Sequence, residues 1–395
     1  MVRRNALSAS HEMENKLIAV LSCNGGTVTH GSGPANQLLV ATLHGMHVFE
    51  RAGQGAPWKR TRSTLEDRHV SALLYEPQSG LLFAGAHGKG GMWCSRDLGL
   101  TWEPRGNGLK REHVYTLAAQ QRDGKVVLYL GTEPSALYRS DDLGENWVEV
   151  SAMLAVPDQE KWTFPPPPHV AHVKNVAFHP KHPETLYVCI EQGALLKTTD
   201  DGANWTEPRS YESEQDKFYH DNHRVLIRQS NPAQLFMCGG EGLHYSADAG
   251  ETWKHLMTRA DRIGYPDAMF IDPRDENVLY IAGPGNAPRE WGAKRSADAT
   301  VMRSKDGGES WQEIRNGMPA EVIGNIEGMG LYHWGDEVML LAGTATGEVY
   351  ASEDGGEHWQ TVDDALPPIS KGGHFRWFLR VDEREKVEDR MRTGT

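Results

Sequence analysis

Short apolar runs separated by turn residues recur along the whole chain. VSALLYEP (70–77) is followed by LLFAGA (81–86), and VKNVAFHP (173–180) is followed by TLYVCI (185–190). Such runs, bounded by Gly, Pro, Asn or Asp, are typical of β-strands joined by short turns. Four further pairs follow the same pattern, at 114–132, 225–239, 268–283 and 329–343. The pattern predicts an all-β chain built from repeated strand pairs.

A second pattern follows each of these pairs. Six segments share the rule Ser/Thr-x-Asp-x-Gly-x-x-Trp and start 45 to 58 residues apart. They are SRDLGLTW (95–102), SDDLGENW (140–147), TTDDGANW (198–205), SADAGETW (246–253), SKDGGESW (304–311) and SEDGGEHW (352–359). The aspartate can accept backbone N–H bonds within a tight turn, the glycine can adopt a positive φ, and the tryptophan can anchor the returning strand. A unit that recurs at such a period predicts a repeat architecture.

Each repeat contains enough strands for one blade of a β-propeller. The strand pair and the two strands that flank each turn give four strands per unit. Segment 37–60 keeps the strand rhythm and Trp58 without the motif, and it supplies a seventh unit. We therefore predict a seven-bladed β-propeller as a single domain over 1–395. The expected blades are 16–62, 69–105, 113–150, 169–208, 220–257, 262–316 and 325–363, followed by a closing segment and tail at 364–395. Either 16–22 or 374–381 is expected to complete the first blade.

The Ser/Thr-x-Asp-x-Gly-x-x-Trp repeat resembles the Asp-box, or BNR repeat, of sialidase-like β-propellers over roughly residues 35 to 363. Several functions follow from this resemblance. A sialidase is disfavoured, because the chain lacks that group's Arg-Ile-Pro element and its axial positions hold histidines rather than arginines. Xyloglucanase-type relatives use two such propellers and paired aspartates, whereas this chain has room for one. Photosystem II assembly factors and sortilin-type receptors resemble the repeat as well, and they are binding scaffolds.

Composition narrows the range of partners. The chain carries 41 Lys and Arg against 54 Asp and Glu, so nonspecific binding to nucleic acid or to an anionic membrane is not expected. No apolar run reaches the length of a membrane span. No apolar stretch follows the two N-terminal arginines, so no secretory leader is visible, and Cys189 and Cys238 are expected to be buried thiols. These features predict a cytoplasmic protein, although a precursor that had lost its leader would look the same.

Aligned repeats place histidines at equivalent positions, at the start of the inner strand of each blade. His69, His113 and His172 occupy this position in three successive blades, and the next blade offers His220, Asp221 and His223. Later units offer Tyr265 or Asp267, Glu327 and His374. Because the starts of inner strands converge around the axis of a propeller, four imidazoles are expected to meet there. We predict one divalent metal ion (iron, zinc, manganese or copper) held by His69, His113, His172 and His223, with His220 as the substitute for His223.

Carboxylates follow the second strand of three blades, on the same face as the histidines. They are Glu133, Glu191 and Glu241, and they are expected to accept the second N–H of the imidazoles or to act in catalysis. Tyr265 is a further candidate for proton transfer.

Three long insertions also fall on this face, at 151–168, 209–223 and 283–300. Long connections on one face of a compact fold predict a lid or a binding wall. The expected substrate-binding residues are Trp162 and Trp291, together with Arg68 and Arg111 for an anionic group. Phe164, Tyr219 and Arg289 are further candidates for the same wall.

The preferred hypothesis is a metal-dependent enzyme that acts on a small organic substrate. The arrangement of the histidine ring is similar to that of the carotenoid cleavage oxygenases, where four histidines from different blades hold ferrous iron. Iron would imply an oxidoreductase, and zinc or manganese would imply a hydrolase or lyase. A metal-free glycoside hydrolase that uses Glu133, Glu191 or Glu241 is the first alternative. A non-catalytic protein-binding scaffold is the second, and histidines inherited from an ancestral repeat without any chemistry also fit the pattern.

Overall fold

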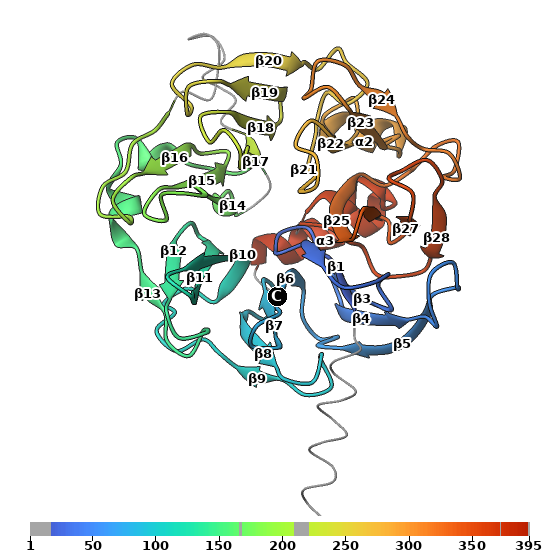
Figure 1. Cartoon of the computed structure of the whole chain (residues 1–395), viewed down its shortest axis with the longest axis horizontal. Helices are drawn as coiled ribbons and strands as arrows, with labels where there is room; N and C mark the ends of the chain where they lie inside the picture. Colours follow the sequence, from blue (N-terminus) through green and yellow to red (C-terminus); the bar gives the residue numbers. More distant parts are fainter. Residues whose placement is uncertain (1–16, 166–167, 209–220, 372, 394–395) are drawn as a thin grey trace, which may run out of the picture.

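Seven sheets surround one axis in the computed structural model, which describes residues 17–165, 168–208, 221–371 and 373–393 (Figure 1). The all-β, seven-bladed propeller predicted from the repeats is confirmed. Blade 1 contains β1 (Ile18–Leu21), β3 (Gln37–Thr42), β4 (Gly45–Glu50) and β5 (Lys59–Thr64). Blade 2 contains β6 (Val70–Glu76), β7 (Leu81–Ala86), β8 (Gly91–Ser95) and β9 (Glu103–Pro104). Blade 3 contains β10 (His113–Arg122), β11 (Lys125–Glu133), β12 (Leu137–Ser140) and β13 (Val148–Glu149).

The remaining blades follow in chain order. Blade 4 has three strands, β14 (His172–Phe178), β15 (Leu186–Glu191) and β16 (Leu195–Thr198). Blade 5 contains β17 (Asn222–Ile227), β18 (Leu235–Gly239), β19 (Gly242–Ser246) and β20 (Lys254–Met257). Blade 6 contains β21 (Ala268–Ile271), β22 (Leu279–Gly283), β23 (Thr300–Ser304) and β24 (Gln312–Glu313). Blade 7 contains β25 (Ile326–Trp334), β26 (Glu337–Thr344), β27 (Val349–Ser352), β28 (Gln360–Asp363) and, as a fifth strand, β2 (Val28–His30).

The N-terminal segment closes the ring. Strand β1 pairs with β3 in parallel, so it runs opposite to the usual inner strand of a blade. The chain then crosses to blade 7, where β2 pairs in parallel with β25. Of the two segments expected to complete blade 1, the structure therefore uses the N-terminal one. Segment 374–381 is not a strand, since His374–Phe378 form the short helix η4.

All six repeat turns share one hydrogen-bond pattern. In each, the Ser or Thr hydroxyl donates to the Asp carboxylate at 2.7–2.8 Å. The glycine N–H then donates back to that hydroxyl, with the glycine at φ of 81° to 100°. The conserved spacing of the motif is thus the spacing that a positive-φ turn with an Asp acceptor requires.

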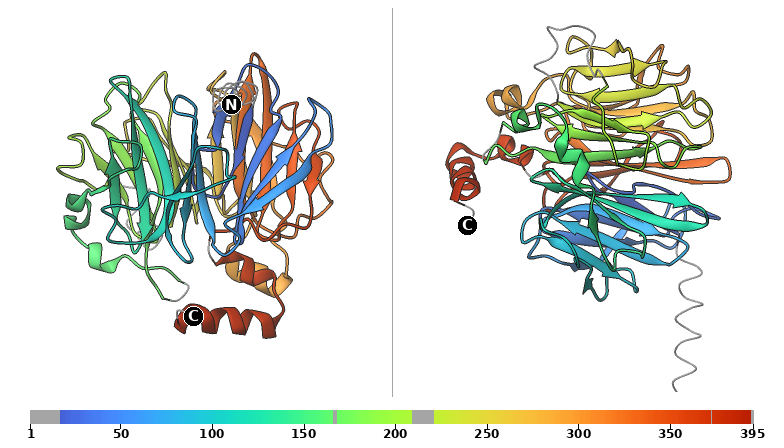
Figure 2. Two further views of the ribbon diagram at one scale, coloured as in Figure 1. Left: turned by 90° about the horizontal axis from the view of Figure 1, so that it is seen from below. Right: turned by 90° about the vertical axis from the view of Figure 1, so that its left-hand side faces the viewer.

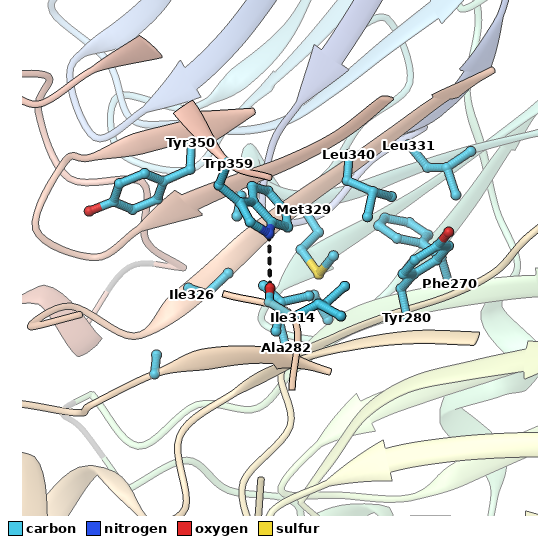
Figure 3. Close-up of a cluster of buried hydrophobic side chains, with 14 of the residues drawn as sticks. Phe270, Tyr280, Ala282, Ile314, Ile326, Met329, Leu331, Leu340, Tyr350 and Trp359 are labelled. Atoms are coloured by element: carbon cyan, nitrogen blue, oxygen red, sulfur yellow. Dashed lines mark hydrogen bonds between the residues drawn. The ribbon is translucent and has the colours of Figure 1, made fainter. Parts of the chain in front are cut away.

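Apolar side chains from neighbouring blades fill the space between them. In the cluster of blades 6 and 7, Trp359 lies among Ile326, Met329 and Tyr350, and its indole N–H donates to the carbonyl of Ile314 at 2.8 Å (Figure 3). Cys189 and Cys238 are buried thiols, as expected, and so are Cys23 and Cys94.

Helices gather on one face of the ring, the face on which the inner strands begin. They are α2 (Pro288–Lys294), η4 and α3 (Val381–Thr393), and Figure 2 shows them together there. Two short helices, η1 (Ser151–Ala155) and η2 (Gln159–Lys161), form in the first long insertion. Among the described residues, no helix combines the length and the apolar character that crossing a membrane requires.

Candidate active site

A cavity of about 280 Å³ lies on the face that carries the helices. The insertion before β14 contributes Phe164 to its wall, α2 contributes Arg289, and η4 contributes Trp377. Asp221 immediately precedes β17, and Tyr265 lies shortly before β21. Two of the long insertions and the C-terminal segment therefore build the walls, and two loops that lead into inner strands supply the polar floor.

A larger cavity of about 690 Å³ lies at the opposite end of the axis, between the ends of β10, β14, β17 and β21. Its lining is mainly apolar groups and amides. Its titratable residues are Arg122, Asp123, His179 and Glu276, and Glu276 stabilises a turn, since it accepts the backbone N–H of Gln229 at 2.6 Å and of Ser230. The smaller cavity has the greater concentration of titratable groups, and we take it as the candidate site.

Asp221 is the carboxylate that reaches the cavity. One of its oxygens lies 3.2 Å from Nε2 of His223, and the other accepts the hydroxyl of Tyr265 at 3.1 Å. Gly240 packs directly against this side chain, since a Cβ there would lie 2.4 Å from Oδ2 of Asp221. The turn between β18 and β19 therefore holds the carboxylate from behind, and Asp221 keeps only 7% of its surface exposed.

The environment keeps Asp221 ionised and Tyr265 protonated. Burial by itself raises the pKa of Asp221, but the charge and hydrogen bond of His223 act more strongly in the other direction, so the pKa is lowered. Burial raises the pKa of Tyr265 well above its usual value, and the nearby Asp221 acts in the same direction. At neutral pH the site thus contains a carboxylate base with a phenol as its hydrogen-bond donor.

A buried network of ions lies behind Asp221, near the axis. Nζ of Lys174 lies 3.1 Å from Glu191 and 3.3 Å from Asp267. Nζ of Lys371 lies 3.0 Å from the other oxygen of Glu191 and also pairs with Asp267. Burial opposes ionisation of Glu191, but the two lysines outweigh it and hold the pKa of this carboxyl well below its usual range. The four groups neutralise one another without solvent.

His172 links this network to the cavity wall. Its Nε2 lies 2.7 Å from Glu191, and its Nδ1 lies 3.2 Å from Glu133. Burial lowers the pKa of His172, yet the hydrogen bonds to the two glutamates prevail and the pKa is raised. The ring of Phe164 packs edge-on against the imidazole, with centroids 4.8 Å apart. One aromatic wall of the cavity therefore rests on this glutamate–histidine–glutamate arrangement.

The C-terminal segment crosses the axis and completes the site. The carbonyl of Ser370 lies 3.0 Å from Nε2 of His69, and the carbonyl of Lys371 accepts the hydroxyl of Tyr115 at 2.8 Å. The backbone N–H of Lys371 donates to Glu327. These contacts join blades 2, 3 and 7 to the strap that leads into η4.

The predicted ring of four histidine ligands is not formed. Nε2 of His69 points to the carbonyl of Ser370. The two ring nitrogens of His172 point to Glu133 and Glu191. Those of His223 point to the carbonyl of Pro266 and to Asp221. His113 is exposed at the rim beside His87, with ring centroids 5.1 Å apart. His220 lies outside the described residues. Alignment of the repeats gave the correct face but not the direction of each ring, which depends on the loops of neighbouring blades.

One group of three potential ligands comes together in the described part of the chain. It consists of Glu191, Asp221 and His223, whose ligand atoms lie within 4.8 Å of one another. Only His223 belongs to the predicted set. Because Lys174 and Lys371 already neutralise Glu191, this donor set fits an internal ion network better than a divalent cation.

Most of the other predicted site residues have structural partners. Glu133 and Glu191 pair with histidines as expected, whereas Glu241 pairs with Arg259 at 2.8 Å at the edge of the cavity. Tyr265 lies in the cavity wall.

The predicted substrate-binding residues lie elsewhere. Arg68 stacks on Trp93, and Arg111 pairs with Glu149. Trp162 packs into the apolar cluster of blade 4, and Trp291 is buried behind Tyr265. Neither arginine lines the cavity, because each is held by a partner within its own blade or the next.

Sequence reasoning missed the residues of the C-terminal strap and the lysines. Arg376 and Trp377 escaped because 374–381 had the alternation of a strand, and Lys371 precedes that segment, where no motif marked it. Lys174 escaped because a lysine within an inner strand usually faces solvent. Its position two residues after His172, on the same strand, was the available signal.

Comparison with known proteins identifies the family of the chain. The family model of the DUF6242 beta propeller domain matches residues 156–384, more than half of the sequence. The chain belongs to the DUF6242 beta-propeller family.

The DUF6242 propeller is also similar to the oligoxyloglucan-reducing end-specific xyloglucanase of Emericella nidulans, with 23% identity over 210 residues. The match covers 50% of this chain and 23% of that protein. A xyloglucanase of a Paenibacillus species is 23% identical over 260 residues, which are 61% of this chain and 20% of that one. The DUF6242 propeller thus spans less than a quarter of the length of these relatives.

Solved structures of similar shape agree on the fold. An ancestral GH74 enzyme superposes with a TM-score of 0.52 at 13% identity, over 72% of this chain and 37% of that one. YCF48 bound to a D1 peptide superposes with a TM-score of 0.52 at 16% identity, over 82% of this chain and 89% of that one. At these identities the similarity concerns the propeller alone.

The relatives overturn the expected metal-dependent oxygenase or hydrolase. They are xyloglucanases, glycoside hydrolases named for a polysaccharide rather than for a small organic molecule. Three of the histidines that suggested a metal, His69, His172 and His223, have partners within the protein. The interpretation as a metal enzyme was therefore wrong, and of the alternatives the relatives favour the metal-free glycoside hydrolase.

Proposed function

We propose that this propeller hydrolyses a glycosidic bond in the 280 Å³ cavity, with its own side chains as the catalysts. The observation that carries the proposal is Asp221, an ionised carboxylate at the floor of a cavity with aromatic walls. The similarity to xyloglucanases supports a polysaccharide or an oligosaccharide as the substrate. The shared geometry of the six turns supports descent of the repeats from Asp-boxes.

Asp221 is the proposed general base. Glycoside hydrolysis with inversion needs a carboxylate that removes a proton from the attacking water. Asp221 is ionised, and the hydroxyl of Tyr265 and the imidazole of His223 fix both of its oxygens. Tyr265 and His223 are therefore positioning residues, since they orient the carboxylate without having to contact the sugar.

His374 is the proposed proton donor to the leaving oxygen. It lines the same cavity, on the other side of Tyr265, with the two ring centroids 6.4 Å apart. Its Nδ1 lies 3.2 Å from Glu327, so a carboxylate stands beside the ring on the side away from the leaving oxygen. Among the described residues, Asp221 is the one carboxylate that lines the cavity, so a histidine takes the role that a second carboxylic acid has in most glycosidases.

The shape of the cavity limits the substrate to the end of a chain. Its volume is just below the range of roughly 300–1,000 Å³ for small-molecule sites. Phe164 and Trp377 provide flat faces, on which the C–H faces of a pyranose ring stack. We therefore expect release of a terminal unit rather than cleavage within a long polymer.

A substrate screen tests the proposal. Wild-type protein is incubated with xyloglucan oligosaccharides, other β-glucans and acidic glycans, and released reducing sugar is measured. The Asp221→Asn variant is expected to lose at least about 100-fold in kcat, as is usual for a general base. The Asp123→Asn variant is the matched control, because Asp123 is exposed on a hairpin of the opposite face. Equal activity of wild type and Asp221→Asn on every substrate would refute the role of Asp221.

Leaving-group chemistry separates the acid from the base. An aryl glycoside with an acidic phenol needs little protonation of its leaving oxygen. The His374→Asn variant is therefore expected to recover most of its activity on such a substrate, whereas Asp221→Asn is not. If both variants respond alike, His374 is not the acid. Binding of glycans without any turnover would instead favour a binding propeller.

A further inference from the structure

The charge of the cavity wall is opposite to that of the whole protein. Among the described residues, Arg259, Arg289 and Arg376 line the cavity together with His374, and Asp221 is the one carboxylate that does so. The chain as a whole carries a net charge of −13. A neutral sugar does not require such a concentration of cations, because hydroxyl groups are recognised as well by neutral donors.

Arg289 is one of the exposed cations of this wall. It lies in the first turn of α2, where the positive end of the helix dipole disfavours a cation. In the described ranges of the chain, no carboxylate forms an ion pair with it, and its side chain is exposed at the cavity wall. A guanidinium in this position gains little for the fold and can pair with a bound anion.

The other cations are held in place by the protein. Nε of Arg259 donates to the carbonyl of Gly240 at 2.8 Å, and its Nη2 pairs with Glu241. The guanidinium of Arg376, which is 6% exposed, lies 5.1 Å from the ring centre of Trp377. Arg384 of α3 lies 5.5 Å from that ring centre, so two cations contact the aromatic wall. The positive field at the cavity is therefore fixed before a ligand arrives.

We propose that the cavity accepts a sugar residue that carries a carboxylate, a uronic acid at the end of a glycan, and that Arg289 pairs with this carboxylate. The inference rests on the proposed glycoside hydrolysis and names its substrate class. Arginine is suited to the task because its planar guanidinium can form two parallel hydrogen bonds to a carboxylate. The negative charge of Asp221 turns the acidic group of the sugar toward Arg289 and leaves the glycosidic carbon toward the base.

The test compares matched acidic and neutral ligands on the full chain. Cellobiuronic acid and cellobiose differ in one carboxylate, galacturonobiose and galactobiose differ in two, and binding is measured by calorimetry or NMR titration. The Asp221→Asn variant serves as the host wherever turnover would interfere. We expect the acidic disaccharide to bind at least about tenfold more tightly than its neutral partner, with an affinity that falls as salt is added.

Variants locate the effect. Arg289→Gln is expected to lose about tenfold in affinity for the acidic ligand and to keep its affinity for the neutral one. Arg295→Gln, at the end of the same helix, removes the same charge from an exposed position outside the cavity lining and is expected to change neither. Circular dichroism and unfolding temperature verify that each variant is folded. Equal binding of acidic and neutral ligands by wild type, or equal losses in Arg289→Gln and Arg295→Gln, would overturn the inference.

The two proposals fail in different ways. If neutral oligosaccharides are cleaved in an Asp221-dependent manner and acidic ones neither bind nor react, the substrate class is wrong and the hydrolase stands. If acidic disaccharides bind through Arg289 but are never cleaved, the anion site stands and the hydrolase falls. Displacement of the bound uronate by inorganic sulfate at equal concentration would show a general anion site, and the assignment to a sugar acid would fall.

Discussion

Lys371 and Glu191 are 180 positions apart in the chain, yet Nζ of the lysine lies 3.0 Å from the carboxylate in the interior of the propeller. The lysine belongs to the segment that follows the last blade, and the glutamate ends the second strand of blade 4. Their contact joins the C-terminal strap to the opposite side of the ring. Because the strap continues into η4, this ion pair also fixes three side chains of the cavity wall, His374, Arg376 and Trp377.

Removal of the strap lysine is expected to be strongly destabilising. In Lys371→Met, Lys174 is the one lysine left beside Glu191 and Asp267, so the buried network holds more negative charge than its cations balance. Breaking a buried pair in this way lowers the free energy of unfolding by about 3–5 kcal/mol. Denaturant unfolding measures the change, with the exposed Lys305→Met as the control. A loss no larger than that of the control would show that solvent reaches the network.

Acid sensitivity is expected from His69. Burial, with the adjacent His87 in the same direction, lowers the pKa of His69 from 6.5 to about 3. Between pH 6.5 and about 3, His69 binds a proton in the unfolded chain but not in the folded one. The contribution of His69 to the free energy of unfolding is therefore fully present above pH 6.5 and is lost as the pH falls toward 3. In His69→Gln the free energy of unfolding should depend less on pH within this window. His182→Gln, on an exposed loop, should leave the pH dependence of the wild type intact, and an unchanged slope in His69→Gln would contradict the assignment.

Trp359 tests the role of the repeat tryptophan. Trp359→Phe keeps a ring in the cluster but deprives the carbonyl of Ile314 of its donor, which is expected to lower the free energy of unfolding by about 1–2 kcal/mol. Trp359→Ala also opens a cavity and is expected to lower it by about 3–5 kcal/mol. In Trp311→Phe the lost bond lies within the turn itself and the side chain is half-buried, so a smaller effect is expected. Equal effects of the two Phe substitutions would mean that the bond across blades adds nothing.

Removal of divalent cations is expected to leave the protein unchanged. The carboxylates at the axis are neutralised by Lys174 and Lys371, which occupy the places that a metal ion would take. Dialysis against EDTA should therefore alter neither the unfolding temperature nor hydrolysis. A decrease that added zinc, iron or manganese reverses would contradict this account of the ion network.

The repeated motif determined the fold because its requirements are local. Eight residues, as at Ser304–Trp311, contain the Asp acceptor, the positive-φ glycine and the Trp that begins the next strand. Six copies of this motif, each separated by the length of one blade, predict a propeller. The face of the site followed from the same logic, since strand direction places His172, Asp221 and Tyr265 at the same end of their blades.

Tertiary structure decided which of those residues contact one another, and which other residues lie between them. The sequence could not show that His69 donates to a strap from the far end of the chain, or that Lys371 neutralises Glu191. Both depend on the path of a segment that forms η4 rather than a strand. Side-chain direction at the axis is set by contacts between blades, which no local pattern encodes. The sequence by itself therefore determined the propeller and the face on which these residues lie, and the packing of distant segments determined that this face holds an ion network and a cationic cavity instead of a ring of histidine ligands.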